Sequence, residues 1–340
     1  MTVHEVGASA LNFLHTSRDL VDPVLRAAVD TMPPAIARMA GYQMGWWDEH
    51  GTPINARRGK SIRPALVYAS AAAVGGTAGS VGAAAAAVEL VHDFSLIHDD
   101  VMDADETRRH RPSLWTVFGV SPAILAGDAL LNLAVRVLAD SDHLAAPQAI
   151  RLLTHMVVDL LNGQSADLAF ETRADIGLSE CRRMAEEKTG ALFGCSCALG
   201  ALFGGGSAAQ VAHLTTFGRR LGLAFQHIDD LLGIWGDPAL TGKPVFSDLR
   251  NRKKSLPVVA AMSFGGSTGA ELADLFARDE PLTEAELGRA ADLVDRAGGR
   301  TWSQDQAEGL LTEALVELGQ CAPLDDGLAT LAELFVQRDR

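Results

Sequence analysis

Two short acidic clusters are the residues of this sequence best suited to chemistry. Asp99, Asp100 and Asp103 fall in the stretch HDDVMD, and Asp229 and Asp230 fall in FQHIDD. On a helix, Asp99 and Asp103 are four residues apart and project from one face. Carboxylates stacked in this way repel each other unless a cation lies between them, and Mg²⁺ takes oxygen ligands that often include substrate phosphates. The clusters indicate a divalent metal site, although the first could also be a solvated acidic helix end before a basic turn.

The neighbours of both clusters favour the metal site. The runs Val88-Glu89-Leu90-Val91 and Phe94-Ser95-Leu96-Ile97 precede the first cluster, and the second lies inside the apolar stretch 211–235. Helices of this composition are largely buried, and buried carboxylates need partners.

Cationic groups lie near both clusters in the sequence. Arg57, Arg58, Lys60 and Arg63 occur within seven residues, at the expected start of a helix over 64–73. Helix starts bind anions through free N–H groups and the helix dipole. The alternative is a basic loop that aids solubility. A second basic patch occupies 250–254.

Two further groups could bind an anion or belong to the core. His92 lies seven residues before Asp99, two turns down roughly the same face, and could instead be a satisfied core residue. Lys188 and Thr189 are adjacent on a helix expected over 179–202, where the lysine could simply extend its head to solvent.

The elements that must position these groups are expected to be helices. Helical spacing of apolar residues, Ala-rich stretches and Gly/Pro breaks recur throughout, with no strand-like alternation and no fixed-period repeat. We expect an all-α fold forming a single large helical bundle around a central cavity. Residues 1–340 form one domain in this interpretation, with a flexible arm over 1–18 and ordinary amphipathic helices over 270–340.

Composition excludes several classes of protein. The chain has 340 residues, 48% of them hydrophobic, and a formal net charge of −14. A nucleic-acid binder normally has a basic surface, so that class is disfavoured. Four cysteines match no zinc spacing and suggest buried thiols in a reducing compartment. We see no signal peptide and no convincing membrane span, and expect a cytoplasmic location.

The two acidic clusters and the nearby cationic groups together indicate chemistry on a diphosphate. The economical arrangement places the two acidic clusters across a cavity, where Mg²⁺ joins them to a diphosphate and Lys and Arg hold the remaining oxygens. An apolar, water-poor hole between the helices would suit a long hydrocarbon. Such a site promotes C–O heterolysis in an allylic diphosphate and protects the carbocation from water.

The motifs, taken in order, resemble the trans-isoprenyl (polyprenyl) diphosphate synthases. The resemblance covers about 59–257 and is most like a geranylgeranyl diphosphate synthase. It is carried by GKSIRP at 59–64, HDDVMD at 98–103 with RRHRPS at 108–113, GDALL at 127–131, GQSADL at 163–168, KTG at 188–190, FQHIDD at 225–230 and GKPVFSDLRNRKKSLP at 242–257. Any one motif is weak, but the ordered set is specific.

The resemblance implies a role for each matching residue. Isopentenyl diphosphate would be held by Lys60, Arg63, His92 and Arg109. The allylic diphosphate would be held by Arg108, Lys188, Thr189, Lys243 and Lys253, with Gln226 lining the site. Magnesium, about three ions per active site, would be bound by Asp99, Asp103 and Asp229. The catalytic set would be Asp99, Asp100, Asp103, Lys188, Asp229 and Asp230. The family also implies a homodimer.

Three positions depart from the family pattern. Gly233 stands where the family usually has a third aspartate, and Asp237 would compensate if the helix continued that far. Arg252 and His110 each stand where a glycine is common.

Product length is implied by the residues just before the first aspartates. Phe94 is fifth before Asp99 and Ser95 is fourth, with no insertion in the motif. In the family, a bulky ring about one turn below the aspartates forms the cavity floor, and this pattern resembles the C20 class. The alternative is that Phe94 is only packed core.

Two other functions fit parts of the pattern. A class I terpene cyclase shares the fold and the metal-triggered ionisation but needs no second diphosphate site. A non-catalytic regulatory subunit of a heteromeric synthase would tolerate Gly233. The cationic set at Lys60, Arg63 and His92 favours the synthase.

Overall fold

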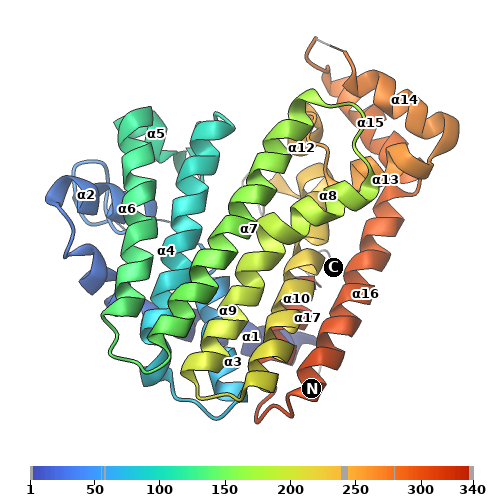
Figure 1. The fold of residues 1–340 in the computed structure, drawn as a ribbon. Helices are drawn as coiled ribbons and strands as arrows, with labels where there is room; N and C mark the ends of the chain where they lie inside the picture. Colours follow the sequence, from blue (N-terminus) through green and yellow to red (C-terminus); the bar gives the residue numbers. More distant parts are fainter. Residues whose placement is uncertain (1–2, 55, 57–58, 239–243, 279, 337–340) are drawn as a thin grey trace. The chain divides into compact units, whose positions relative to one another are not determined.

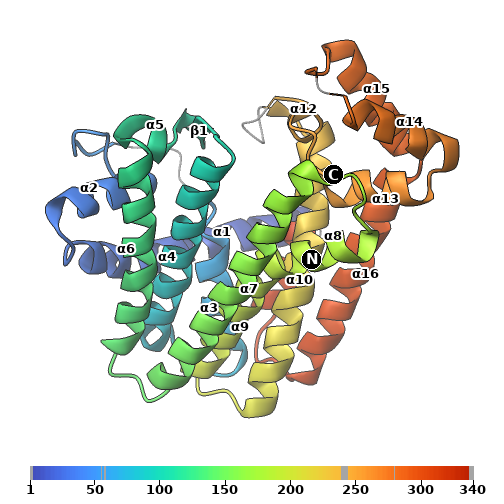
Figure 2. The ribbon, with the colours of Figure 1, turned by 45° about the horizontal axis from the view of Figure 1, so that its top comes forward.

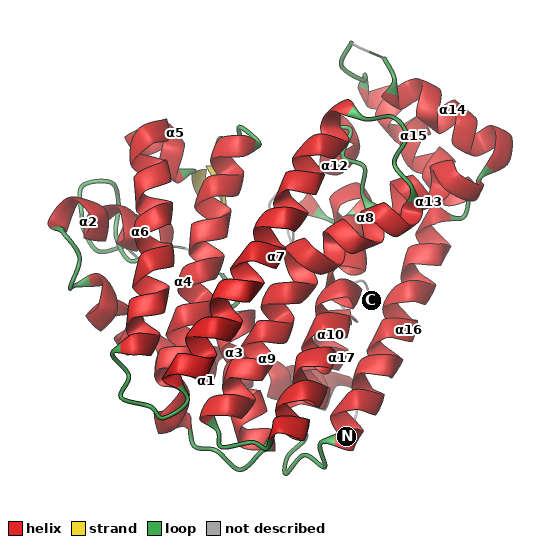
Figure 3. Ribbon diagram, viewed as in Figure 1, coloured by secondary structure: helices red, strands yellow, loops and turns green. Residues whose placement is uncertain are grey.

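The computed structural model describes residues 3–54, 56, 59–238, 244–278 and 280–336. Helices account for nearly all of its regular structure (Figure 3), which confirms the all-α prediction. The chain divides into two compact units: Met1–Val157 with Cys195–Thr215 and Gly319–Leu331, and Val158–Gly194 with Thr216–Leu318 and Ala332–Arg340. We call them unit 1 and unit 2 and describe each by itself, so the single domain over 1–340 stays a prediction.

Unit 1 is built on two long neighbouring helices, α4 and α6, which lie side by side in Figures 1 and 2. Its elements are α1 (Val3–Val29), α2 (Pro34–Gln43), α3 (Ile62–Ala73), α4 (Ala78–Met102), β1 (Thr107–Arg108), β2 (Arg111–Pro112), α5 (Leu114–Phe118) and α6 (Val120–Ala139). Five helices have residues in both units: α7 (Ala146–Thr172), α9 (Ala191–Phe203), α10 (Ala208–Trp235), α16 (Gly299–Gln320) and α17 (Gly327–Val336).

Unit 2 contains the remaining helices. They are α8 (Leu178–Ala185), the π-helix η1 (Glu186–Gly190), α12 (Ser247–Arg250), α13 (Leu256–Phe264), α14 (Gly266–Phe276) and α15 (Glu284–Arg296). An apolar cluster that includes Leu249, Val258 and Leu287 joins α12, α13 and α15. Leu249 is fully buried, so the single turn of α12 is anchored to this cluster.

The expected flexible arm over residues 1–18 is wrong from Val3 onward, because these residues form the first turns of α1. The helix continues because its apolar stripe does: Ala10, Leu14, Val21 and Leu25 are buried at spacings of three to four or their multiples. Burial of this stripe stabilises a helix that local sequence preferences alone would leave marginal.

Small residues let the unit 1 helices approach closely. A Cβ added to Gly200 on α9 would lie 2.2 Å from the carbonyl oxygen of Val67 on α3. On α4, Ala84–Ala87 are fully buried. The small residues of these helices therefore allow close helix packing.

Two helices in the described part of the chain are long and apolar enough to cross a membrane by length and composition. They are α4 and α6, with 67% and 39% of their apolar windows buried. The two helices pack against each other, so part of the apolar surface of each is buried as core.

Candidate active site

The first acidic motif ends α4 and presents its carboxylates in two directions. Asp99 is half-buried and Asp103, the C-cap residue, is exposed, whereas Asp100 is buried. Adjacent residues of a helix are rotated by about 100°, so one of a pair turns inward when the other faces out. Asp99 and Asp103 therefore share the outer side, as the four-residue spacing predicted.

Asp100 is anchored by the arginine that follows the motif. Arg108 Nε donates to Asp100 Oδ1 at 2.8 Å, and a second guanidinium nitrogen contacts the same oxygen. Burial raises the pKa of Asp100, and the Arg108 guanidinium opposes that rise. Arg108 also lies 3.4 Å from Asp105. Arg108 thus fixes the end of α4, and its predicted contact with the allylic diphosphate stays a prediction.

The arginines lie on a tight hairpin that the sequence did not predict. Thr107–Arg108 pairs with Arg111–Pro112, and the two loop residues, Arg109 and His110, have φ of 53° and 64°. A two-residue hairpin with a type I′ turn needs positive φ at both positions. His110, which replaces the common glycine, is therefore held in a left-handed conformation that His tolerates better than most residues.

The tip of this hairpin lies against the loop that carries Lys60. A Cβ on Gly59 would lie 2.6 Å from a terminal nitrogen of Arg109. From α1, Arg18 contacts the Gly59 carbonyl and donates to Ser61 Oγ at 3.3 Å. The guanidinium of Arg109 thus lies against Gly59 in the GKSIRP motif, where a larger residue would make it shift.

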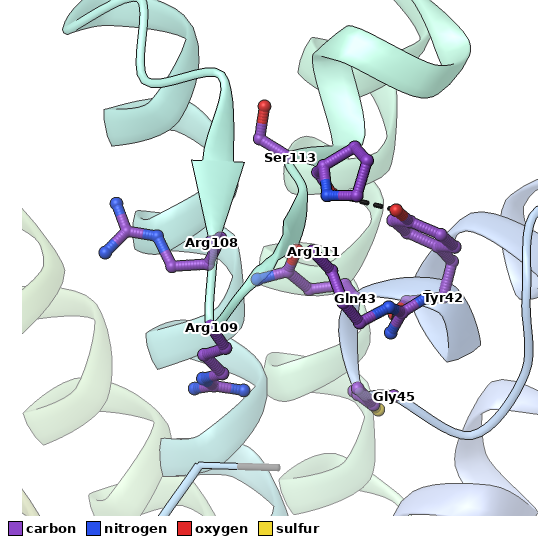
Figure 4. A pocket seen from close by; sticks show the side chains of 9 residues that line it. Tyr42, Gln43, Gly45, Arg108, Arg109, Arg111 and Ser113 are labelled. Carbon is purple, nitrogen blue, oxygen red and sulfur yellow. Dashed lines mark hydrogen bonds between the residues drawn. The ribbon is translucent and has the colours of Figure 1, made fainter. Parts of the chain in front are cut away.

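Arg108, Arg109 and Arg111 border a pocket of unit 1 (Figure 4), but they make different contacts. Arg111 donates to the carbonyls of Tyr42 and Trp47 at 3.1 and 3.3 Å and stacks on the Tyr42 ring. Arg111 thus fixes the loop after α2. Arg109 lines this pocket and a second one, beside Gly59 and Ser61. Arg109 is the hairpin arginine best placed to meet an anion.

His92 lies in the field of these cations. Burial lowers the pKa of His92 well below 6.5, and Arg63, Arg109 and Arg108 lower it further. His92 is therefore neutral at physiological pH and can act as a hydrogen-bonding group. Arg63, His92 and Arg109, predicted to hold one diphosphate, lie in one region of unit 1, and Lys60 is exposed at the end of the same loop.

The predicted chain-length residues lie lower on α4. Phe94 is buried, with 3% of its surface exposed, and its ring packs edge-on against His98 with the centroids 4.8 Å apart. His98 in turn lies 3.0 Å from the Ile124 carbonyl of α6. Ser95 Oγ donates to the His92 carbonyl at 2.8 Å. The Phe94 ring is therefore held in place by a neighbour one turn further along.

The second acidic motif, like the first, has one buried aspartate next to a more exposed one. On α10, Asp229 is exposed and Asp230 is buried. Asp230 accepts hydrogen bonds from Gln226 Nε2 at 2.7 Å and from the backbone N–H of Leu256 at 2.9 Å. Burial raises the pKa of Asp230 to about 6, although Lys253 opposes the rise. Asp230 thus joins α10 to the first residue of α13.

Gln226 and Thr189 belong to the same network. Thr189 Oγ1 donates to Gln226 Oε1 at 2.6 Å, so the amide of Gln226 connects the KTG motif to Asp230. The network fixes the orientation of the amide, which sequence alone could not specify.

Lys188 and Thr189 lie on a π-helix, not on the regular helix expected over 179–202. Between α8 and α9, η1 has one more residue per turn than an α-helix, a feature often found at functional sites. Lys188 Nζ donates to Asp167 Oδ2 at 2.7 Å. Burial raises the pKa of Asp167, but Lys188 and Lys253 lower it below 3.8 overall. This partner shows that Lys188 does more than reach solvent.

Lys253 is surrounded by carboxylates of unit 2. Its Nζ lies 3.7 Å from Asp230 Oδ1 and 3.9 Å from Asp248 Oδ2. Burial lowers the pKa of Lys253, but Asp248, Asp230, Asp167 and Asp229 together hold it well above 10.5. Lys253 therefore stays charged.

Two expectations at the end of α10 have different outcomes. The helix ends at Trp235, so Asp237 does not continue the acidic face of α10 and cannot replace the missing aspartate in that way. Lys243 lies outside the described residues, as do Arg57 and Arg58.

The acid set fits magnesium bound together with a substrate. Within the described ranges, no three His, Cys, Asp or Glu side chains converge closely enough to hold an ion alone. Asp99, Asp103 and Asp229 each present oxygen ligands at a surface that is not fully buried. Mg²⁺ keeps several waters and is commonly bound by one or two carboxylates plus substrate phosphates. These residues therefore suit an ion that arrives with a diphosphate.

Asp99 belongs to unit 1 and Asp229 to unit 2, so their expected opposition across a cavity stays a prediction. Sequence reasoning missed three residues of these networks: Arg18, Asp167 and Asp248. Asp167 and Asp248 stood inside the motifs at 163–168 and 242–257, but neither spacing indicated the lysine that each meets. Arg18 lay in the supposed arm.

Comparison with known proteins agrees with this chemistry. Residues 46–294 match the polyprenyl synthetase family. A (2E,6E)-farnesyl diphosphate synthase of Mycobacterium tuberculosis is 44% identical over 95% of this chain and 91% of its own. A geranylgeranyl diphosphate synthase of the same organism is 45% identical over 96% and 93%. The crystal structure of a polyprenyl synthetase from Streptomyces coelicolor superimposes with a TM-score of 0.91 at 43% identity, covering 96% of this chain and 99% of that one. The chain belongs to the polyprenyl synthetase family, whose members are trans-prenyltransferases acting on prenyl diphosphates.

Proposed function

We propose that this chain condenses isopentenyl diphosphate with an allylic prenyl diphosphate and releases C20 geranylgeranyl diphosphate. The observation that carries the proposal is the repeated arrangement of the acid pairs. In each motif one carboxylate is buried and held by protein groups, while its neighbour is presented outward beside cations. If these acids served only to keep the helices soluble, no carboxylate would need to be buried, because burying a charged group costs free energy.

In this proposal, Asp99, Asp103 and Asp229 hold Mg²⁺ together with the allylic diphosphate. When bound, Mg²⁺ stabilises the charge that develops on the departing diphosphate. Lys188 and Lys253 hold diphosphate oxygens, and Thr189 and Gln226 keep the surrounding groups oriented. Lys243 and Arg108 would complete the cationic set.

The second substrate is assigned to unit 1. Arg63, Arg109 and Lys60 hold the diphosphate of isopentenyl diphosphate, and neutral His92 donates a hydrogen bond to it. The isopentenyl double bond then attacks the allylic cation, and the released diphosphate takes the proton. Two separate cationic sets support a condensation of two diphosphates over the terpene cyclase alternative, which needs only one.

The C20 product rests on Phe94. Its buried ring, fixed by His98, lies five residues before Asp99, which is about 7.5 Å along the axis of α4. The relatives include both a C15 and a C20 synthase at nearly equal identity, so the length assignment belongs to this proposal.

Product analysis tests the function directly. The enzyme is incubated with isopentenyl diphosphate and Mg²⁺ plus dimethylallyl, geranyl or farnesyl diphosphate, and products are read by mass spectrometry. We expect C20 product from each primer, no product without isopentenyl diphosphate, and none after chelation of divalent ions. Release of a cyclised hydrocarbon from the primer alone would refute the proposal. The proposal includes a homodimer, which sedimentation velocity tests, and a cytoplasmic location.

A further inference from the structure

The two acidic motifs of this chain differ at one position. The first reads Asp99-Asp100-x-x-Asp103, and the second reads Asp229-Asp230-x-x-Gly233. A side chain at position 233 would lie on the same face of α10 as Asp229, four residues earlier. The second motif therefore lacks the third carboxylate that the first motif has.

The space for that side chain is filled by another aspartate. A Cβ built on Gly233 would lie 2.2 Å from Oδ2, 2.4 Å from Cγ and 2.7 Å from Oδ1 of Asp248. The entire carboxylate thus lies where a side chain from α10 would begin. An aspartate at 233 would require the Asp248 side chain to leave its present position.

The turn before Asp248 is fastened to the end of α10. Ser247 Oγ donates to the Gly233 carbonyl at 3.2 Å, and the Phe246 N–H donates to the Ile234 carbonyl at 3.1 Å. Phe246 has φ of 63°, which a bulky residue rarely adopts. Buried Leu249 holds the other side of the turn. These contacts maintain a strained backbone whose result is the placement of Asp248.

Asp248 also faces the cation of the site. Its side chain is 12% exposed, and Oδ2 lies 3.9 Å from Nζ of Lys253, which is 35% exposed. Asp230 lies 3.7 Å from the same nitrogen. Asp248 therefore adds negative charge around Lys253, whose pKa Asp229 also raises, and helps to orient a lysine assigned to the diphosphate.

We propose that Asp248 is the third carboxylate of the second acidic motif, supplied from α12 in place of a side chain at Gly233. It is a positioning residue: it adds charge to the region that Asp229 presents to Mg²⁺ and holds Lys253 toward the diphosphate. The inference rests on the proposed function, since it assumes that Asp229 binds magnesium. It predicts that a carboxylate can be moved from position 248 to position 233 without loss of the site.

A charge-relocation experiment tests this proposal. Binding of Mg²⁺ in the presence of inorganic pyrophosphate is measured by calorimetry and by the shift in melting temperature, so that turnover is not needed. Asp248→Asn keeps the shape and removes the charge, and we expect about tenfold weaker Mg²⁺ binding, as for other groups that support metal ligands. The double variant Gly233→Asp/Asp248→Ala should bind nearly as the wild type does. Asp305→Asn, at an exposed position of α16, is the control.

The outcomes separate this inference from the proposed function. Mg²⁺ binding by Asp248→Asn that equals the Asp305→Asn control overturns the inference, as does a folded double variant that binds no better than Asp248→Asn. Asp229→Asn should abolish Mg²⁺-dependent pyrophosphate binding. If it does not, the proposed function itself fails.

Discussion

Gly163 on α7 should be one of the least replaceable residues of unit 2, because Lys188 lies directly on it. A Cβ at Gly163 would lie 2.4 Å from the backbone nitrogen and 2.9 Å from the Cα of Lys188, and 3.0 Å from the carbonyl carbon of Glu187. All three are backbone atoms, which cannot rotate away. Gly163→Ala must therefore push the π-helix η1 off α7 or distort both.

The magnitude follows from two opposing terms. Replacing Gly by Ala inside a helix normally stabilises by about 0.5–1 kcal/mol. Overpacking a close contact costs about 1–3 kcal/mol, and contact with backbone places this substitution at the upper end. We expect a net loss of about 2 kcal/mol, which lowers the melting temperature by roughly 3 °C for a chain of this length. Displacement of Lys188 should also reduce kcat/KM for the allylic diphosphate about tenfold to a hundredfold.

The assay has a matched control on another long helix. At Gly309 on α16, an added Cβ meets nothing within 4 Å. Gly309→Ala should raise the melting temperature slightly and leave kinetics unchanged. Thermal unfolding followed by circular dichroism and steady-state kinetics are measured for both variants. If Gly163→Ala behaves as Gly309→Ala does in both measurements, the argument from close approach is wrong.

Substitutions at four other residues test separate parts of the structure. Phe94→Ala should lengthen the products seen by mass spectrometry while Phe94→Leu changes them less, and an unchanged distribution would remove Phe94 from chain-length control. Asp229→Asn should abolish activity with little change in melting temperature. Asp100→Asn leaves Arg108 without its buried charged partner and should lower the free energy of unfolding by about 3 kcal/mol. Equal stability of the two variants would contradict the different burial of the two aspartates. His92 has a folded-state pKa below its unfolded value, so the unfolded chain binds more protons below pH 6.5 and stability falls on acidification. His92→Gln should therefore lose less stability than the wild type between pH 7 and 5 in urea titrations, and parallel curves would show that His92 does not contribute.

The fold was predictable because its signals are local. Helical spacing of apolar residues placed α3 and α10 to within a few residues. The N-terminal helix was missed even though α1 has buried apolar residues such as Ala10 and Leu14 inside the expected arm. Tertiary burial decided the helix there, and no local propensity reports burial.

The sequence predicted most residues of the candidate site but not the contacts between them. Motif order identified the acids and the lysines, yet Asp167 and Asp248 were missed because their partners are 21 and five residues away, at spacings set by tertiary packing. The π-helix at Lys188 was missed for a similar reason: an extra residue in one turn leaves the hydrophobic pattern almost unchanged. Gly233 looked like a loss in the sequence, and only the position of Asp248 shows what fills its place.

The adjacency of two aspartates has a physical reason in this architecture. Neighbouring residues on a helix differ in direction by about 100°, so a pair cannot present both carboxylates to one ligand. Asp100 and Asp230 point inward and are held by Arg108 and by Gln226 with the Leu256 N–H. Each anchor fixes the rotation of its helix about its own axis, and that rotation determines where Asp99 and Asp229 face. The buried aspartate of each pair therefore sets the direction of its more exposed neighbour, and loss of either anchor should weaken metal binding without removing a ligand.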